Sequence, residues 1–320
     1  MKKHFFLFAT LFLYIVAFAQ TEKDNYKIVS NKFVAYFNEN NYDSIVAMFS
    51  PEMNAALPIE KFTQVGTSLK LQVGAIKNIR FIRIQSGTAL YETFFDNAVL
   101  AMTINLNKKN QIAGLMFKPY TEAKEIERNT TLMKLPFKGE WTVFWGGDTE
   151  ALNYHVESKA QKNAFDIMIM DEKGLTHKGS GQTNEDYYAF GMELFAPCAG
   201  EIVLVVDGIK DNVPGTLNPI YIPGNTVIIK TLNGEYVFFA HFKQHSIVVK
   251  QGQMVKAGDL LGLCGNSGNS SEAHLHFHLQ NVEDMIVATG AKCFFEQLKV
   301  NGVLKSDYSP VKGDKVEGVN

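Results

Sequence analysis

Apolar positions follow a helical spacing in the first part of the chain and a strand-like pattern afterwards. Over residues 24–38 and 42–49, apolar side chains such as Ile28 and Phe33 recur every three to four residues, which predicts amphipathic helices. A further helical stretch follows Pro58. Alternating apolar segments then predict four strands, over residues 75–85, 88–95, 98–106 and 111–119. Helices followed by a meander of strands predict an α+β domain over residues 20–120, with the helices packed on one curved antiparallel sheet.

The second part of the chain has almost no helical periodicity. Residues 121–136 are charged and polar as far as Pro136, and they indicate a short helix or a linker. Beyond them, turn residues rich in glycine and proline separate short apolar runs, at residues 202–206, 226–229, 236–242 and 247–249. This pattern predicts a mainly antiparallel β domain over residues 137–300, followed by a C-terminal tail over residues 301–320.

The first residues, MKKHFFLFATLFLYIVAFAQ, have the pattern of a secretory signal peptide. Two lysines precede an apolar run from Phe5 to Phe18, and Ala17-Phe18-Ala19 has the small-x-small pattern of a cleavage site. A single transmembrane anchor is the competing interpretation, but the apolar run is short for a bilayer span. We therefore expect a signal peptide over residues 1–19 and an exported protein, periplasmic or secreted, without a transmembrane anchor after cleavage.

Composition limits the partners more than it identifies them. The 320 residues suffice for two domains, and 46% hydrophobic and 20% charged residues are typical of a globular protein. The net charge of −2 and the lack of a basic run argue against a nucleic-acid partner. Cys198, Cys264 and Cys293 are odd in number and form no CxxC element, so they are either buried apolar side chains or include one disulfide.

The stretch SEAHLHFHL, residues 271–279, places three of the eight histidines at alternate positions, His274, His276 and His278. Alternate side chains of a strand share one face, so the three imidazoles point one way and the two apolar residues between them point toward a core. Such a row of imidazoles suits a metal site. A solvated strand face is the alternative.

Three segments in order, APCAGEIVLVVDG, GNTVIIKTLNGEYVFFAHF and VKQGQMVKAGDLLGLCGNSGNSSEAHLHFHL, resemble the lysostaphin-type (LytM-like) zinc metallopeptidases over about residues 137–290. These are exported enzymes that cut peptides of the bacterial cell wall. The resemblance implies a zinc endopeptidase in which the metal activates a water, with peptidoglycan peptides as substrate. It also implies the site residues, with His155, Asp166 and His276 as zinc ligands, and His241 and His274 as catalytic residues that supply a general base and stabilise the tetrahedral intermediate.

This chain departs from the family pattern in three places. Ten residues separate His155 from Asp166, where many members have three, so a loop must bulge between the two ligands. Ala273 replaces the proline that often precedes the HLH element. His278 stands where an acidic or other polar residue is common, and we expect it to support the site from outside the ligand set or to be solvated.

Two other functions fit parts of the sequence. Family members that have lost ligands act as binding proteins that regulate other cell-wall hydrolases, and the long gap between His155 and Asp166 favours that alternative. The stretch VKQGQMVKAGDLLG is similar to the hairpins of lipoyl- and biotin-carrier domains, which require a modifiable lysine at an exposed turn. The remaining histidines, His4, His177 and His245, are expected to be structural or solvated.

The resemblance also bears on the first domain and on the cysteines. The stretch FVAYFNENNYDSIVAMFSPEMNAALPIEKF resembles small exported domains related to the nuclear transport factor 2-like cone, which implies a protein or small-ligand partner and no catalytic role. In the peptidase family, the segments beside Cys198 and Cys264 converge on one end of the β domain, which implies these two as the candidate disulfide.

Overall fold

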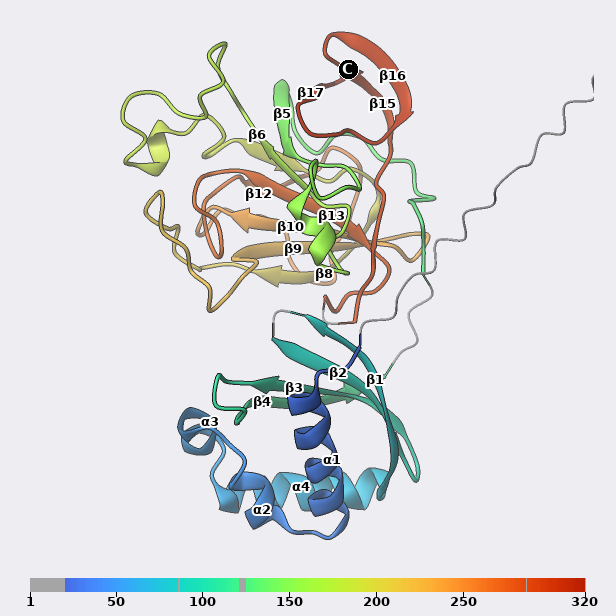
Figure 1. Cartoon of the computed structure of the whole chain (residues 1–320). Coiled ribbons are helices and arrows are strands. Elements are labelled where there is room, and N and C mark those ends of the chain that lie inside the picture. Colours follow the sequence, from blue (N-terminus) through green and yellow to red (C-terminus); the bar gives the residue numbers. More distant parts are fainter. Residues whose placement is uncertain (1–20, 86, 121–124, 286, 320) are drawn as a thin grey trace, which may run out of the picture. The chain divides into compact units, whose positions relative to one another are not determined.

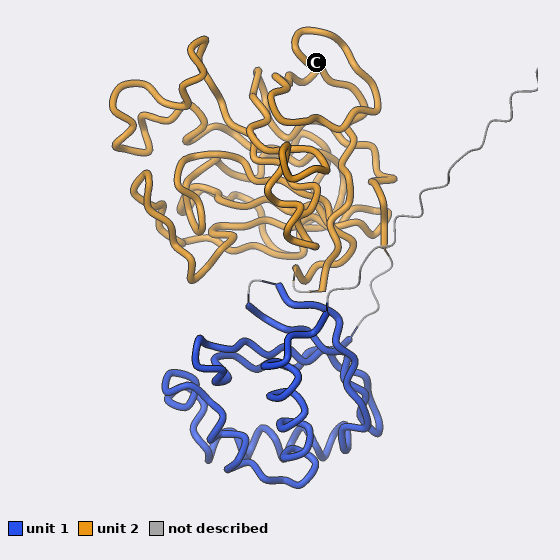
Figure 2. The backbone as a smooth tube through the Cα atoms, in the orientation of Figure 1, with its two compact units in different colours: residues 1–120 blue, residues 121–320 orange. Residues whose placement is uncertain are grey.

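The computed structural model describes residues 21–85, 87–120, 125–285 and 287–319. The chain divides into two compact units, residues 1–120 and 121–320 (Figure 2). The expected signal peptide over residues 1–19 lies outside the described residues. Within the part of the chain that is described, no helix is both long and apolar enough to span a bilayer.

The described residues of the first unit combine four helices with one antiparallel meander (Figure 1). Its sheet has the order β1-β2-β3-β4, and its core is largely aromatic, with Phe33, Phe37, Tyr91 and Phe95 among the buried side chains. The elements are α1 (Asp24–Asn38), α2 (Tyr42–Val46), α3 (Pro51–Ala56), α4 (Ile59–Val73), β1 (Ile76–Gln85), β2 (Thr88–Phe95), β3 (Val99–Leu106) and β4 (Ile112–Pro119). The predicted α+β architecture is confirmed.

Helix α1 shows how the sequence pattern sets the buried face. Tyr26, Val29, Phe33 and Phe37 are buried because their spacing of three to four residues aligns them on one face. Ile28 lies on the other face and is 55% exposed, so its assignment to the apolar stripe was wrong. The second predicted helix is also shorter than expected, because α2 ends at Val46.

The second unit is almost entirely β, as predicted. Its main sheet has the order β11-β8-β9-β10-β13-β6-β5-β17-β15-β16, with β14 paired to β13, and β12 and β7 form a separate pair. The strands are β5 (Glu140–Trp145), β6 (Phe165–Met168), β7 (Glu193–Phe195), β8 (Gly200–Val206), β9 (Asn225–Thr231), β10 (Tyr236–Phe242), β11 (Met254–Val255), β12 (Leu260–Leu263), β13 (Leu275–Gln280), β14 (Gly290–Ala291), β15 (Phe295–Val300), β16 (Val303–Tyr308) and β17 (Lys315–Gly318). Two short 3₁₀ helices, η1 (Tyr154–Glu157) and η2 (Asn184–Asp186), lie in the connections.

The histidine strand β13 lies between β10 and β6, inside the sheet. Leu275 and Phe277 are fully buried in the main core of the unit, as their alternation with the histidines predicts. The antiparallel register pairs His276 with Asp166 on β6 and with Ala240 on β10. The sheet therefore fixes the positions of three neighbouring segments that carry candidate site residues.

Three boundaries predicted from the sequence differ in the structure. Residues 247–249 form no strand, although Val248 N–H donates to Leu261 O at 2.9 Å. The end of the expected linker packs as part of the second unit, since Met133 is fully buried and Thr130 donates two hydrogen bonds to the Glu235 carboxylate. Residues 301–320 are not a tail, because β16 and β17 extend the sheet and β17 pairs with β5.

Candidate metal centre

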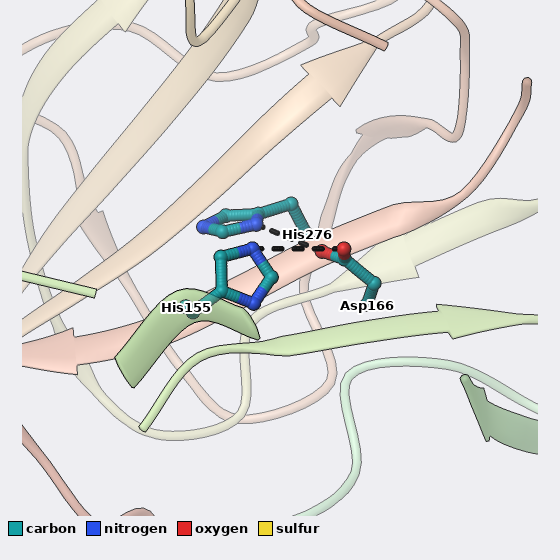
Figure 3. Close-up of side chains that lie close together, drawn as sticks. All are labelled: His155, Asp166 and His276. Atoms are coloured by element: carbon teal, nitrogen blue, oxygen red, sulfur yellow. Dashed lines mark hydrogen bonds and ion pairs between the residues drawn. The ribbon is translucent and has the colours of Figure 1, made fainter. Parts of the chain in front are cut away.

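Three side chains that are distant in sequence converge at one buried point (Figure 3). His155 comes from η1, Asp166 from β6 and His276 from β13, and one ligand atom from each lies within 4.8 Å of the other two. His155 Nε2 is 3.6 Å from Asp166 Oδ2, and His276 Nδ1 is 2.9 Å from Asp166 Oδ1. The structure thus brings together the three residues that the sequence resemblance named as ligands.

The donor set fits zinc. Two nitrogen atoms and one carboxylate oxygen are ligands that zinc accepts, and a catalytic zinc site keeps three protein ligands with an open fourth position. Ligand atoms about 2.0–2.1 Å from a tetrahedral ion lie roughly 3.3 Å apart. The separation of His155 Nε2 from Asp166 Oδ2 is 3.6 Å and that of His276 Nδ1 from Asp166 Oδ1 is 2.9 Å, one on either side of that value.

The ten residues between His155 and Asp166 form a loop that returns the chain to the site. Gly290 N–H on β14 donates to Lys159 O at 2.8 Å, which holds the middle of the loop against the sheet. A Cβ at Gly290 would lie 2.5 Å from Ala160 O, so this close backbone approach requires glycine. The long spacing therefore does not separate the two side chains.

Charge at the cluster favours a cation. Burial raises the pKa of the Asp166 carboxyl, but His155 and His274 outweigh that effect and hold this pKa well below its usual range. Burial lowers the pKa of His155 to about 4. At neutral pH, Asp166 is an anion and His155 is a neutral ring with a lone pair, which is the protonation state that metal binding requires.

His241 and His274 form a second pair beside this cluster, with ring centroids 4.9 Å apart. His274 Nδ1–H donates to Glu272 O at 2.9 Å, which leaves its Nε2 3.5 Å from Asp166 Oδ1. His241 Nδ1–H donates to Ser267 O at 2.7 Å, and its ring centroid is 5.8 Å from that of His276. Each ring is thus held by a backbone carbonyl at Nδ1.

The backbone of His241 is unusual. Its φ is +64°, a left-handed conformation that costs a residue other than glycine about 1–3 kcal/mol. It lies at the end of β10, where the pairing with β9 slips between Phe239 and Phe242. The irregularity turns the His241 ring out of the strand pattern and toward the site, which is a common place for such strain.

The two rings differ in their electrostatics. Burial and the neighbouring His274 hold the pKa of His241 well below its usual range. Burial also lowers the pKa of His274, but the Asp166 carboxylate outweighs it, so the pKa of His274 is raised. His274 therefore holds a proton more readily than His241 in the absence of a metal.

His278 is fully buried, which excludes the solvated role considered for it. Its ring stacks on Phe238 at 4.7 Å between centroids, and its Nδ1 is 3.1 Å from His276 Nε2. Two further residues that contact the cluster histidines were missed in the sequence, Asn153 and Gln280. The signal for Gln280 was the alternation of HLHFHLQ, which continues past His278, and the signal for Asn153 was its position two residues before His155.

His177, His245 and the three cysteines lie apart from the site, and His4 lies outside the described residues. His245 is exposed, and His177 packs against Tyr187 at 5.3 Å between ring centroids. All three cysteines are free and buried. The disulfide between Cys198 and Cys264 is not formed, because the antiparallel pairing of β7 with β12 places these residues beyond opposite ends of that pair.

Two family models match the chain. Residues 30–115 match a family described as a protein of unknown function, DUF3887, and residues 186–287 match Peptidase family M23. The second unit therefore carries a domain of the M23 peptidases, and the resemblance to lysostaphin-type metallopeptidases is confirmed. This family depends on zinc, which agrees with the donor set. The resemblance of the first unit to the nuclear transport factor 2-like cone stays a prediction.

Sequence relatives agree with this assignment. The chain is 33% identical over 103 residues to the cell division protein DipM of Caulobacter vibrioides, covering 32% of this chain and 15% of DipM. It is 36% identical over 73 residues to the peptidoglycan DD-endopeptidase ShyA of Vibrio cholerae, covering 19% of this chain and 17% of ShyA. Both matches span less than a fifth of the relative.

Solved structures include more distant likenesses. Lysostaphin of Staphylococcus simulans is 20% identical with a TM-score of 0.30, covering 51% of this chain and 52% of lysostaphin. A putative glycyl-glycine endopeptidase LytM of Ruminococcus gnavus is 17% identical with a TM-score of 0.33, covering 51% of this chain and 57% of that protein.

Proposed function

We propose that the second unit is a zinc endopeptidase that hydrolyses peptide bonds in bacterial peptidoglycan. The observation that supports this most directly is the buried cluster of His155, Asp166 and His276 with two further imidazoles beside it. The name of the relative ShyA, a peptidoglycan DD-endopeptidase, supports the substrate class. In keeping with that substrate, we propose that the protein is exported and acts in the periplasm or outside the cell.

His155, Asp166 and His276 would hold the zinc ion through two nitrogens and one carboxylate oxygen. When bound, zinc supplies a Lewis acid that polarises the scissile carbonyl and lowers the pKa of water. His241 and His274 each donate Nδ1–H to a backbone carbonyl, so the Nε2 atom of the neutral ring keeps its lone pair. Either ring can therefore take a proton from the attacking water and return it to the leaving amine.

A catalytically inactive regulator of other hydrolases is the second candidate. Its support is the relative DipM, whose name describes a cell division protein. The main sequence argument for it was the gap of ten residues between two ligands, and the loop anchored at Gly290 brings both ligands back to one point. That geometry favours the enzyme.

The test combines metal content with activity. We expect full-length purified protein to contain about one zinc ion per chain and to release soluble peptides from purified peptidoglycan. Replacing His155, Asp166 or His276 by alanine should remove most of the zinc and the activity together, because two ligands rarely hold a catalytic zinc. His245→Ala, which changes an exposed histidine, is the matched control and should retain both.

Each outcome bears on one candidate. Wild-type protein without bound zinc after incubation with the metal contradicts the enzyme. Protein that carries zinc but cuts neither directly cross-linked nor glycine-bridged peptidoglycan favours the regulator. Normal zinc binding by His155→Ala would show that another residue is the ligand.

A further inference from the structure

Two buried side-chain amides lie behind the candidate metal centre, and both are anchored to the main chain. Asn153 Nδ2 donates to Gly147 O and to Ala164 O, each at 2.9 Å. Gln280 Nε2 donates to Val282 O at 2.6 Å and to Glu283 O at 2.8 Å. Both residues are fully buried. Backbone carbonyls only accept hydrogen bonds, so in each case the NH₂ group must face them and the amide oxygen must face the other way.

The oxygen of Asn153 fixes the proton of His155. Asn153 Oδ1 lies 2.8 Å from His155 Nδ1. Because the amide oxygen is an acceptor, Nδ1 must carry the hydrogen. A neutral imidazole has one N–H, so the lone pair of His155 is at Nε2, the atom that faces Asp166 Oδ2 at 3.6 Å.

The oxygen of Gln280 acts on His276 through one intervening ring. Gln280 Oε1 lies 2.8 Å from His278 Nε2, which must therefore donate. His278 Nδ1 is then an acceptor, and the atom 3.1 Å away, His276 Nε2, must donate to it. The lone pair of a neutral His276 is left at Nδ1.

This places two acceptor atoms against each other, because His276 Nδ1 is 2.9 Å from Asp166 Oδ1. Two acceptor atoms at this distance repel each other unless a proton lies between them or a metal ion binds both. The series of hydrogen bonds that starts at Gln280 thus ends at the point where the three candidate ligands meet. The hydrogen bond from Asn153 acts on the other histidine, His155, whose Nε2 faces the second carboxylate oxygen, Asp166 Oδ2.

We propose that Asn153 and Gln280 are positioning residues that hold the two histidine ligands in opposite tautomers, with His155 binding through Nε2 and His276 through Nδ1. His278 transmits the effect of Gln280 and is not a ligand. The proposal rests on the metal centre of the proposed function. It explains how a histidine can stand at position 278, where an acidic or other polar residue is common, since Gln280 forces that ring to accept from His276 as a carboxylate would.

Ring protonation can be observed directly in the full-length zinc-loaded protein. Long-range ¹H–¹⁵N correlation spectra of the histidine rings distinguish a protonated, a bare and a metal-bound nitrogen. We expect N–H at Nδ1 of His155 and at Nε2 of His276, zinc at the opposite nitrogen of each ring, and N–H at Nε2 of His278. Zinc on Nε2 of His276, or a proton on Nδ1 of His278, would overturn the proposal without any variant being made.

Variants then measure the effect on zinc binding. Gln280→Met keeps the length of the side chain but removes its polar atoms, and Asn153→Leu does the same at the other amide. Each should weaken zinc binding by roughly 10–100-fold, the usual effect of changing a residue that orients a ligand. Gln251→Met, at an exposed glutamine, is the matched control and should bind zinc as the wild type does. Affinities of both amide variants within twofold of the wild type would contradict the proposal.

These readouts separate this proposal from the proposed function. Zinc bound with the expected tautomers, but with no cleavage of peptidoglycan, would leave the positioning role intact and contradict the peptidase. Cleavage of peptidoglycan by zinc-loaded protein whose histidines have other tautomers would support the peptidase and contradict the positioning role. In Gln280→Met, His278 should also populate both tautomers in the same spectra, a change that loss of packing alone does not produce.

Discussion

All seven histidines in the described part of the chain lie in the second unit, whereas the described residues of the first unit contain none. The first unit buries mainly aromatic and aliphatic side chains between its helices and sheet. The second unit has a larger apolar core, yet it also buries His155, Asp166, His276 and His278. Burying titratable groups destabilises a fold unless they are paired, so such a cluster indicates a functional site. The first unit also buries two charged side chains, Arg83 and Glu92, but no histidine lies with them. Among the described residues, the buried set of metal-ligating side chains is therefore found in the second unit, and apolar packing does not explain it.

The largest expected effect concerns His241 and His274, the two histidines beside the proposed ligands. His241→Ala and His274→Ala should each lower the rate of peptidoglycan hydrolysis by roughly 10²–10⁴-fold, because each removes a proton acceptor or a stabilising donor. Both variants should retain nearly one zinc per chain, measured by elemental analysis. Loss of zinc in either variant would place that residue among the ligands instead. His177→Ala, away from the cluster, should change neither quantity.

The second prediction compares the two cores. Phe33 in the first unit and Phe277 in the second are both fully buried, so alanine at either position should cost about 3–5 kcal/mol of unfolding free energy. Urea denaturation can separate the units, because both tryptophans lie in the second unit and all four described α-helices lie in the first. Fluorescence should therefore report Phe277→Ala and circular dichroism at 222 nm should report Phe33→Ala.

Zinc binding sharpens this second comparison. Phe277 lies between His276 and His278 on β13, so its removal should also weaken zinc binding, while Phe33→Ala should leave the affinity unchanged. Equal effects of the two substitutions on zinc affinity would show that the units do not behave separately.

The third prediction concerns pH in the metal-free protein. His155, His241 and His278 have lowered pKa values, chiefly because of burial, whereas only His274 in this group has a raised pKa. Between about pH 6.5 and pH 4 the unfolded chain therefore binds more protons than the folded chain, and stability falls as the pH falls. Each such group contributes at most about 1.4 kcal/mol per pH unit.

The fluorescence-detected urea midpoint of chelated protein should accordingly be lower at pH 5 than at pH 7. The midpoint detected by circular dichroism should change less, because no described histidine lies in the first unit. A fluorescence midpoint that is unchanged or higher at pH 5 would contradict the neutral state assigned to the buried rings.

The smallest effect is expected at the cysteines, all of which also lie in the second unit. Burial raises the pKa of Cys198 to about 12, and burial also raises the pKa values of Cys264 and Cys293. A thiol reagent at pH 8 should thus modify none of them within minutes in folded protein, and should modify three after denaturation without reductant. A single reactive thiol after denaturation would instead reveal a disulfide.

Much of the fold followed from local patterns. The four strands of the first unit and strand β10 were predicted almost to the residue, because period-two alternation and turn residues are local signals. The sequence of residues 301–320 does not indicate strands, because β16 and β17 have few buried apolar positions and only their pairing with distant strands orders them. The assignment of Ile28 to the buried face of α1 was wrong, because helical spacing identifies an apolar stripe but not the position of its centre.

Candidate site residues that lie within the segments resembling the peptidase family, such as His241, His274 and His276, could be named from the sequence. The spacing of Asn153 and Gln280 from the histidines is visible in the sequence, but their role is not, because the backbone carbonyls that orient their amides belong to loops that no sequence pattern places. The burial of His278 was likewise unpredictable, since it depends on the stacking of Phe238 from the neighbouring strand.

The loop held at Gly290 has a consequence for how such sites evolve and how they are detected. His155 is oriented by Asn153 two residues away, and Asp166 by its pairing with His276, so neither depends on the number of residues between them. Insertions in that loop can accumulate without moving either side chain. A search pattern with a fixed gap between the two ligands will then overlook these chains. Scanning separately for an Asn-x-His turn and for a strand aspartate would recover them.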